Sequence, residues 1–255
     1  MKGYTEGPVF GLLAMLNQAQ RARDISGSVV EIGVHHGRLF IGMCLLQRAD
    51  EPSVAVDLFD DQERNVDNSG RGDLAQFRRN VARWGCSLPV VHAGDSTQLK
   101  AGDVPEMSGA RLFSVDGGHT ASIVRSDMNL ATNCLTPGGI VIADDVFNPQ
   151  WPDVCVGTLD YLREGDLVPF AVGFNKTLFA HPEYAGAYRA ELIEAYRRRY
   201  LTVPLDDKTF AGHPVVVLVS VPRTPVMLAR RSETARRVVQ AARRVALRGS
   251  AAERV

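Results

Sequence analysis

The sequence predicts an α/β protein built on a doubly wound, mostly parallel sheet. Short apolar, β-branched segments alternate along the chain with segments whose apolar residues recur at helical spacing. This is the pattern of a parallel sheet with helices on both faces. Two of the apolar segments, 112–116 and 139–145, end in acidic residues. In such folds, the carboxyl ends of the strands form the functional edge of the sheet.

The first half of the chain contains three predicted strands, each preceded by a predicted helix. Strands are predicted where apolar residues form short uninterrupted runs, because the strands of a parallel sheet are buried on both faces. Helices are predicted where apolar residues recur every three or four positions. In order, these elements are a helix over 8–24 with Phe10, Leu13 and Leu16 on one side, a strand over 28–32, an apolar helix through Leu46, a strand over 54–57, a helix with Leu74, Phe77, Val81 and Trp84 on one face, and a strand over 89–93.

The second half continues the alternation, and its order is less regular after residue 165. A helix that ends at Pro137-Gly138-Gly139 is predicted from its apolar face and from these breakers. A turn is expected at Asn175-Lys176. The elements are a strand over 112–115, a helix with Val124, Met128, Ala131 and Leu135 on one face, a strand over 140–143, strands over 167–174 and 177–180, a tyrosine-rich helix around 184–199, and a strand over 215–221.

Length and charge predict one globular domain with a basic tail. The chain has 255 residues, 45% of them hydrophobic, which is enough for one sizeable core. We expect a domain over 1–221, whose residues 1–27 form a helical lid, and a tail over 222–255. The tail has nine arginines and two glutamates, a net charge of +7, which leaves −7 on the rest of this neutral chain. The acidic body argues against a nucleic-acid binder; the tail is either an amphipathic helix for an anionic partner or a solvated end.

Several sequence features predict a cytoplasmic protein. No apolar run approaches the roughly 20 residues that span a bilayer, and the first residues lack the apolar core of a signal peptide. The four cysteines show neither a CxxC pair nor zinc-type spacing. We therefore expect them to be reduced structural thiols.

A glycine loop after the first strand predicts a cofactor site. Gly33 and Gly37 follow Glu31 at the strand end in a GxxxG spacing, whereas a dinucleotide site requires GxGxxG for the pyrophosphate. A glutamate beside the loop suits a ligand with a cationic amino group better than a phosphate. Asp57 stands 20 residues after Gly37 at the end of the second strand, the usual place of a carboxylate that accepts both ribose hydroxyls. Together these residues favour S-adenosylmethionine over a nicotinamide dinucleotide.

Other interpretations of these residues stay open. Glu31 and Asp57 could only cap helices or turns. Asp95 and Ser96, at the end of the third strand, are natural neighbours of an adenine but are also ordinary turn residues. His35 and His36 are expected to shape the cofactor loop and to have no chemical role.

Acidic residues at two further strand ends predict a metal and base cluster. Asp116 ends one strand, and Asp144 and Asp145 end the next; carboxylate oxygens of this kind suit Mg²⁺, Ca²⁺ or Mn²⁺. His119 comes three residues after Asp116, so both side chains can face one pocket, with the imidazole as a base near neutral pH. Each piece alone is common as a helix cap or a solvated group, and the metal interpretation depends on their joint position at successive strand ends.

These motifs resemble a known family. Glu31-x-Gly33-x-x-x-Gly37, Asp57, Gly94-Asp95-Ser96, Asp116-Gly117-Gly118-His119 and Asp144-Asp145 resemble the class I S-adenosylmethionine-dependent methyltransferases, and among them the Mg²⁺-dependent sugar O-methyltransferases of actinobacteria, over roughly residues 28–180. The resemblance implies a Rossmann-like fold, Mg²⁺ on Asp116, Asp144 and Asp145, and His119 as general base. It implies that Glu31, Gly33, Gly37, Asp57, Asp95, Ser96 and Asp116 surround the cofactor. Arg38-Leu39-Phe40 departs from the family, which frequently has small hydroxyl residues there.

The expected function is therefore methyl transfer from S-adenosylmethionine to a hydroxyl of a sugar in a glycoside or polysaccharide. Asn148, Trp151 and Asp153 are placed to form a substrate lid, and a homodimer is expected. A catechol-type enzyme, disfavoured by an aromatic content of 7%, and a non-catalytic cofactor-binding protein are the alternatives. A nicotinamide-dependent oxidoreductase is disfavoured by the missing third glycine, and a nucleic-acid methyltransferase by the acidic body. Which sugar and which hydroxyl react does not follow from the sequence.

Overall fold

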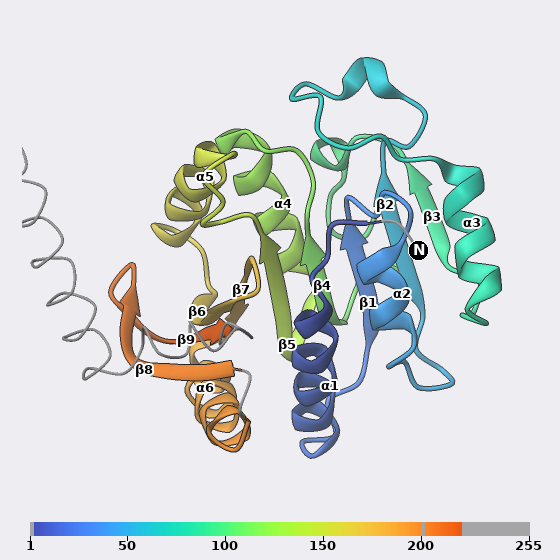
Figure 1. The fold of residues 1–255 in the computed structure, drawn as a ribbon. Helices are drawn as coiled ribbons and strands as arrows, with labels where there is room; N and C mark the ends of the chain where they lie inside the picture. The colour runs from blue at the N-terminus through green and yellow to red at the C-terminus, as the bar shows by residue number, and fades with distance from the viewer. Residues whose placement is uncertain (1–2, 200–201, 221–255) are drawn as a thin grey trace, which may run out of the picture.

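One mixed sheet runs through the molecule. The computed structural model describes residues 3–199 and 202–220, and nine strands of these residues form the sheet (Figure 1). The strands are β1 Ser28–Ile32, β2 Ser53–Asp57, β3 Val90–Ala93, β4 Ala110–Val115, β5 Leu135–Asp144, β6 Val168–Gly173, β7 Lys176–Ala180, β8 Thr202–Phe210 and β9 His213–Ser220. Their order is β3-β2-β1-β4-β5-β7-β6-β9-β8.

The strand pairing confirms the predicted doubly wound, mostly parallel sheet. Strands β1 to β5 pair in parallel, with β1 between β2 and β4. Strand β7 then joins β5 in antiparallel orientation and pairs with β6 in a hairpin. β6 pairs in parallel with β9, and β8 and β9 form a second hairpin. The point where β1 and β4 lie side by side is the switch point at which ligands bind in such sheets.

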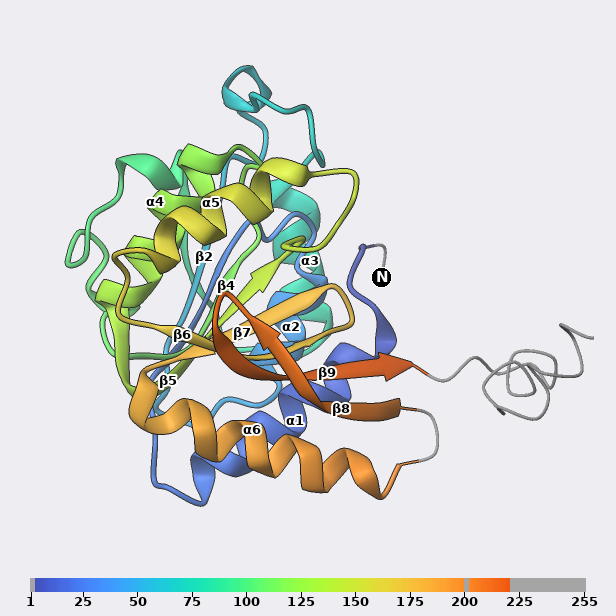
Figure 2. The ribbon, with the colours of Figure 1, turned by 90° about the vertical axis from the view of Figure 1, so that its left-hand side faces the viewer.

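Helices cover both faces of the sheet, as the uninterrupted apolar strands predict. The helices are α1 Gly7–Arg21, α2 Arg38–Cys44, α3 Leu74–Arg83, α4 Ala121–Cys134, α5 Pro152–Leu162 and α6 Pro182–Arg197. Helices α1, α2, α3 and α6 share one core cluster with Val29 and Leu112, and α4 and α5 share the other with Val30 and Phe113. Neighbouring residues of one strand thus face opposite layers, and Figure 2 shows α4 beside α5 and α1 beside α6.

A buried arginine connects α1 to the edge of the sheet opposite the site. Arg111 of β4 is fully buried; its Nε donates to Glu51 at 2.8 Å, and its Nη1 donates to Gln20 of α1 at 3.0 Å. Although burial alone would raise the pKa of Glu51, the Arg111 guanidinium and backbone N–H donors lower it. The three groups satisfy one another where no water reaches them.

Several element predictions need correction. Trp84 is 50% exposed, because α3 ends at Arg83 and Gly85 turns the chain in the left-handed region (φ +66°). Leu135 begins β5 and does not end α4. Helix α5 was not predicted, since its β-branched residues and Gly157 weaken the helical signal. Strand β8 was missed because its exposed, charged centre lacks an apolar run.

The terminal predictions have different outcomes. A helix does form near the N-terminus, as α1 shows. The Arg-rich tail over 222–255 lies outside the described residues. Within the described part of the chain, no helix combines the length and apolarity that crossing a membrane requires.

Candidate active site

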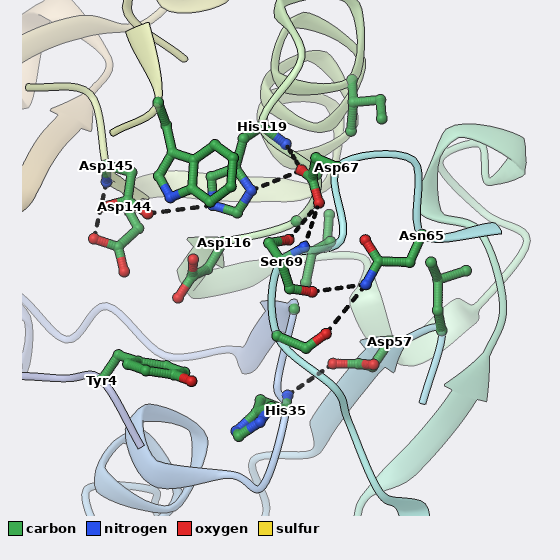
Figure 3. A pocket seen from close by; sticks show the side chains of 18 of the residues that line it. Tyr4, His35, Asp57, Asn65, Asp67, Ser69, Asp116, His119, Asp144 and Asp145 are labelled. Atoms are coloured by element: carbon green, nitrogen blue, oxygen red, sulfur yellow. Dashed lines mark hydrogen bonds and ion pairs between the residues drawn. The ribbon is translucent and has the colours of Figure 1, made fainter. Parts of the chain in front are cut away.

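A cavity of about 880 Å³ opens at the carboxyl ends of β1, β2, β4 and β5. Its wall brings together most of the polar residues that the sequence singles out, together with the loop 58–73 and the turn between β6 and β7. Figure 3 shows these side chains pointing toward one space from separate elements. The predicted residues that line it are Gly33, Asp57, Asp95, Ser96, Asp116, His119, Asp144 and Asp145.

Asp57 is held rigidly at one end of this cavity. Its Oδ2 accepts a hydrogen bond from the backbone N–H of His35 at 2.7 Å, and its Oδ1 accepts one from Phe59 at 2.6 Å. Burial raises the pKa of Asp57, and these N–H donors oppose that effect. Each carboxylate oxygen keeps one lone pair, so the group can still accept hydrogen bonds from a ligand. His35, with φ +49°, shapes the loop as predicted.

The glycine loop passes close to the next strand. Gly33 has φ +83°, and a Cβ built there would lie 1.7 Å from the carbonyl oxygen of Asp116. Gly37, with φ +85°, precedes α2 and packs on Phe77. Only glycine tolerates this combination of conformation and contact, so the GxxxG spacing has a structural cause.

Two predicted cofactor residues lie outside the cavity wall. Glu31 is buried in β1 at 2% exposure, and burial raises the pKa of its carboxyl group to about 8. Gly37 likewise is not among the lining residues. Asp95 lines the cavity, but its Oδ1 accepts from the backbone N–H and hydroxyl of Thr97 at 2.9 and 2.7 Å, which is the turn interpretation of that residue.

His119 sits between two carboxylates. Its Nδ1 lies 2.8 Å from Oδ2 of Asp67, and its Nε2 lies 3.2 Å from Oδ2 of Asp145. The same Asp67 oxygen accepts from the backbone N–H of His119 at 2.6 Å. Although burial favours the neutral ring, hydrogen bonds to Asp145 and Asp67 raise the pKa of His119. The ring is therefore oriented through both of its nitrogens and is basic, as a proton acceptor must be.

Both partners of His119 are themselves fixed in place. Ser69 donates to Asp67 through its N–H at 2.9 Å and its hydroxyl at 2.5 Å. Asn148 donates to Asp145 at 2.6 Å. Against the effect of burial, these donors and His119 lower the pKa of each carboxyl group to about 2.

The predicted substrate lid divides into two parts. Trp151 stacks on the His119 ring, with centroids 4.2 Å apart and planes at 22°, and Asn148 contacts Asp145. Both residues line the cavity, whereas Asp153 lies in the first turn of α5 and does not. Trp151 thus closes one face of the imidazole.

Asp116 and Asp144 face a buried lysine that sequence reasoning did not identify. Lys176 of β7 forms an ion pair with Oδ2 of Asp144, and its Nζ lies 3.9 Å from Oδ2 of Asp116. Burial and the neighbouring Asp144 raise the pKa of Asp116 well above its usual value. Burial lowers the pKa of Lys176, but the charges of Asp116 and Asp144 raise it by more. Lys176 therefore stays an ammonium ion.

The oxygen donors at this edge fit a hard divalent cation in part. Ligand atoms of Asp116, His119 and Asp145 lie within 4.8 Å of one another. Carboxylates crowded together in this way repel one another, and a cation relieves that repulsion. Asp144 is not in this group, and its oxygens accept hydrogen bonds from Lys176, Asn175 and the N–H of Asp145.

Comparison with known proteins identifies a matching family model and similar folds. Residues 30–146 match the model of a family described as a methyltransferase domain. The fold is that of the class I methyltransferases. The segment from β1 to the end of β5 carries the match, and it contains Asp57, Asp116, His119 and the Asp144-Asp145 pair. No curated protein matches the chain significantly.

Solved structures of methyltransferases share the fold at low sequence identity. The O-methyltransferase NovP aligns with a TM-score of 0.52 at 14% identity, over 68% of this chain and 78% of its own. CalS11, a TDP-rhamnose 3′-O-methyltransferase of calicheamicin biosynthesis, gives 0.50 at 19% identity, over 68% and 79%. The O-methyltransferase TomG from Streptomyces achromogenes, in complex with S-adenosylmethionine, gives 0.49 at 18%, over 70% and 81%.

Proposed function

We propose that this protein is an S-adenosylmethionine-dependent O-methyltransferase that methylates a hydroxyl of a sugar in a glycoside or polysaccharide. The observation that carries the proposal is His119, a basic imidazole fixed between Asp67 and Asp145 in the wall of the cavity that Gly33 and Asp57 also line. A base beside a cofactor cavity is what transfer to a hydroxyl requires.

We propose that the parts of the cofactor bind along this cavity. In our proposal Asp57 accepts hydrogen bonds from the ribose hydroxyls, and Asp95 and Ser96 lie near the adenine. Gly33 and Asp116 border the methionine portion, and we place its amino group on the side of Glu31, whose carboxyl group is buried in β1. Six aspartates line this cavity, and an acidic wall suits a cofactor that carries a sulfonium and an ammonium group.

His119 then performs the proton transfer. Asp67 accepts the Nδ1 hydrogen, so Nε2 is the nitrogen that takes the proton of the acceptor hydroxyl. The oxygen forms its bond to the methyl carbon as the bond from that carbon to sulfur breaks. Positioning of the two reactants contributes most of the rate, and the base contributes about 10²–10⁴-fold.

Mg²⁺ is the proposed metal, with Asp116 and Asp145 as its first ligands and Asp144 as the third. Bound there, the ion would polarise the acceptor hydroxyl and lower its pKa. Asp145 then has a second role, because it also contacts Nε2 of His119. Rotation of Asp145 toward a cation would leave Nε2 free to accept a proton.

Support for a sugar acceptor comes from two sources. The motifs resemble the sugar O-methyltransferases, and CalS11, which shares the fold, is described as a TDP-rhamnose methyltransferase. Acceptor choice depends on loops such as 58–73 and 146–151, which contribute polar side chains to the cavity. A homodimer and a cytoplasmic location remain predictions, and light scattering of the purified chain tests the first.

Calorimetric titration and an activity assay test the proposal. S-adenosylmethionine and NAD⁺ are titrated into chelator-treated protein, and methylation of glycosides and catechols is then assayed with and without Mg²⁺. We expect S-adenosylmethionine to bind and NAD⁺ not to bind. Methyl transfer to a glycoside should require Mg²⁺. Catechol methylation would contradict the sugar acceptor, and metal-independent transfer would contradict the role of the carboxylates. Full activity of His119→Ala would contradict the base.

A further inference from the structure

Lys176 places a permanent positive charge where the carboxylates converge. It begins β7 and pairs with Asp144 across the antiparallel β5–β7 ladder, and only 2% of its side chain is exposed. Lysine is almost never buried to this extent unless it is paired. Among the residues that the structure describes, Arg64 is the other permanent cation of the cavity wall; it is 59% exposed and pairs with Asp61.

The geometry of the β6–β7 turn explains how the lysine reaches this position. Phe174 and Asn175 both adopt left-handed conformations, with φ of +56° and +63°. This tight turn returns the chain along β5, so that Asn175 donates to Asp144 at 2.9 Å and Lys176 follows directly beside it. Backbone pairing thus places Lys176 beside Asp144, and the ion pair with Asp144 holds its ammonium.

The ammonium and a divalent cation would use the same oxygens. Lys176 contacts Oδ2 of Asp144 and lies 3.9 Å from Oδ2 of Asp116. A metal ion that used both Asp116 and Asp144 would have to displace the ammonium or lie close to it. At such separations in a partly buried site, repulsion between a monovalent and a divalent cation is strong.

We propose that Lys176 is a built-in competitor of the divalent cation, which weakens metal binding and keeps Asp116 and Asp144 paired when no metal is present. The catalytic role of the metal rests on the proposed function, but the affinity of the site for the metal can be measured without turnover. The wild-type site then binds the ion at millimolar concentrations, through Asp116 and Asp145, and Asp144 joins only when the ammonium moves away.

Metal titration of lysine variants tests this inference. Mn²⁺ binding to the full chain is followed by electron paramagnetic resonance, and Mg²⁺ binding by calorimetry. Lys176→Gln removes the charge but keeps a donor for Asp144, so we expect Mn²⁺ to bind about tenfold or more tightly. Lys176→Arg keeps the charge and should bind the ion as weakly as the wild type. The exposed Lys208, which pairs with Asp207, supplies the control Lys208→Gln, which should change nothing.

A second background protects the experiment against a folding defect. If Lys176→Gln does not fold, Asp144→Asn is compared with the double variant Asp144→Asn, Lys176→Met, in which both partners are neutral. The double variant should bind Mn²⁺ about tenfold or more tightly than the single variant, since only the ammonium differs.

The outcomes separate this inference from the proposed function. Micromolar Mn²⁺ affinity in the wild type, or no tightening when Lys176 is neutralised, would overturn the role of Lys176. S-adenosylmethionine is titrated into the same samples. Its failure to bind the wild type would refute the proposed function, whereas the metal titrations would still decide the inference about Lys176.

Discussion

At the residue scale, the orientation of His119 depends on Asp67. One Asp67 oxygen contacts both the backbone N–H and the Nδ1 of His119, so the carboxylate selects the tautomer with hydrogen on Nδ1. That choice makes Nε2 the nitrogen that can accept a proton once Asp145, which contacts it, turns away. The arrangement follows the logic of an aspartate that orients a catalytic imidazole.

Replacement of Asp67 by Asn should therefore impair the reaction and spare cofactor binding. The amide presents a donor as readily as an acceptor, and the preferred tautomer is lost. We expect kcat to fall about 10- to 100-fold, a usual range for groups that orient a functional imidazole, with the Kd of S-adenosylmethionine within about twofold. Nitrogen NMR of the His119 ring should show the change of tautomer directly.

A neighbour in the same loop provides the matched control for this variant. Asp61 pairs with Arg64 at the surface, where 48% of its side chain is exposed, and Asp61→Asn should leave both kcat and the tautomer unchanged. An unchanged ring signal in Asp67→Asn would show that Asp67 does not orient His119, whatever happens to the rate.

At the scale of elements, the turn from β1 into α2 and the end of β4 fit together through the backbone. The loop that carries the cofactor motif passes over the carbonyl of Asp116 because Gly33 has no side chain. The position of Asp116, and hence of the acidic cluster, depends on this close approach. A substitution at Gly33 should therefore affect Asp116 directly, because the two residues are in contact.

Gly33→Ala should destabilise the protein, because the new Cβ would collide with a backbone oxygen and φ is positive. We expect a loss of about 2 kcal/mol or more in the free energy of unfolding, measured by denaturant titration. Gly186 of α6 is the matched control: it is helical and no atom lies within 4 Å of a Cβ built there. Gly186→Ala should be neutral or stabilise by up to about 1 kcal/mol; equal effects of the two substitutions would contradict the explanation.

At the scale of the whole molecule, buried carboxyl groups make stability depend on pH. Burial raises the pKa of Glu31 from its usual 4.5 to about 8, so the folded state holds a proton that the unfolded chain releases. Stability from this group is complete below pH 4.5 and is lost as pH rises through about 8. One pKa unit corresponds to about 1.4 kcal/mol, so the total effect amounts to several kcal/mol.

Glu31→Gln should flatten that dependence. Without cofactor or metal, the wild-type free energy of unfolding should fall between pH 5 and pH 9 more steeply than that of the variant, as measured by urea titration at each pH. The exposed Glu164 supplies the control Glu164→Gln, which should retain the wild-type slope. Parallel curves for wild type and Glu31→Gln would show that Glu31 is ionised throughout.

The sequence by itself determined where the parallel strands lie along the chain and which polar residues follow them. Short, β-branched runs such as 28–32 and 140–143 favour strands in a sheet covered on both faces, and such runs are local information. It therefore predicted that Asp57, Asp116, His119, Asp144 and Asp145 share one edge, and these five residues line one cavity.

Only the tertiary structure decided how that cluster is paired. Asp67 lies 52 residues before His119 in a polar loop without periodicity, and Lys176 lies 32 residues after Asp144 in a strand that turns back on the sheet. No local pattern reports which loop folds over a site or where an antiparallel hairpin inserts. The partners of the base and of the acidic pair are therefore long-range contacts, set by packing and strand register, and they determine which carboxylates are free for a metal ion.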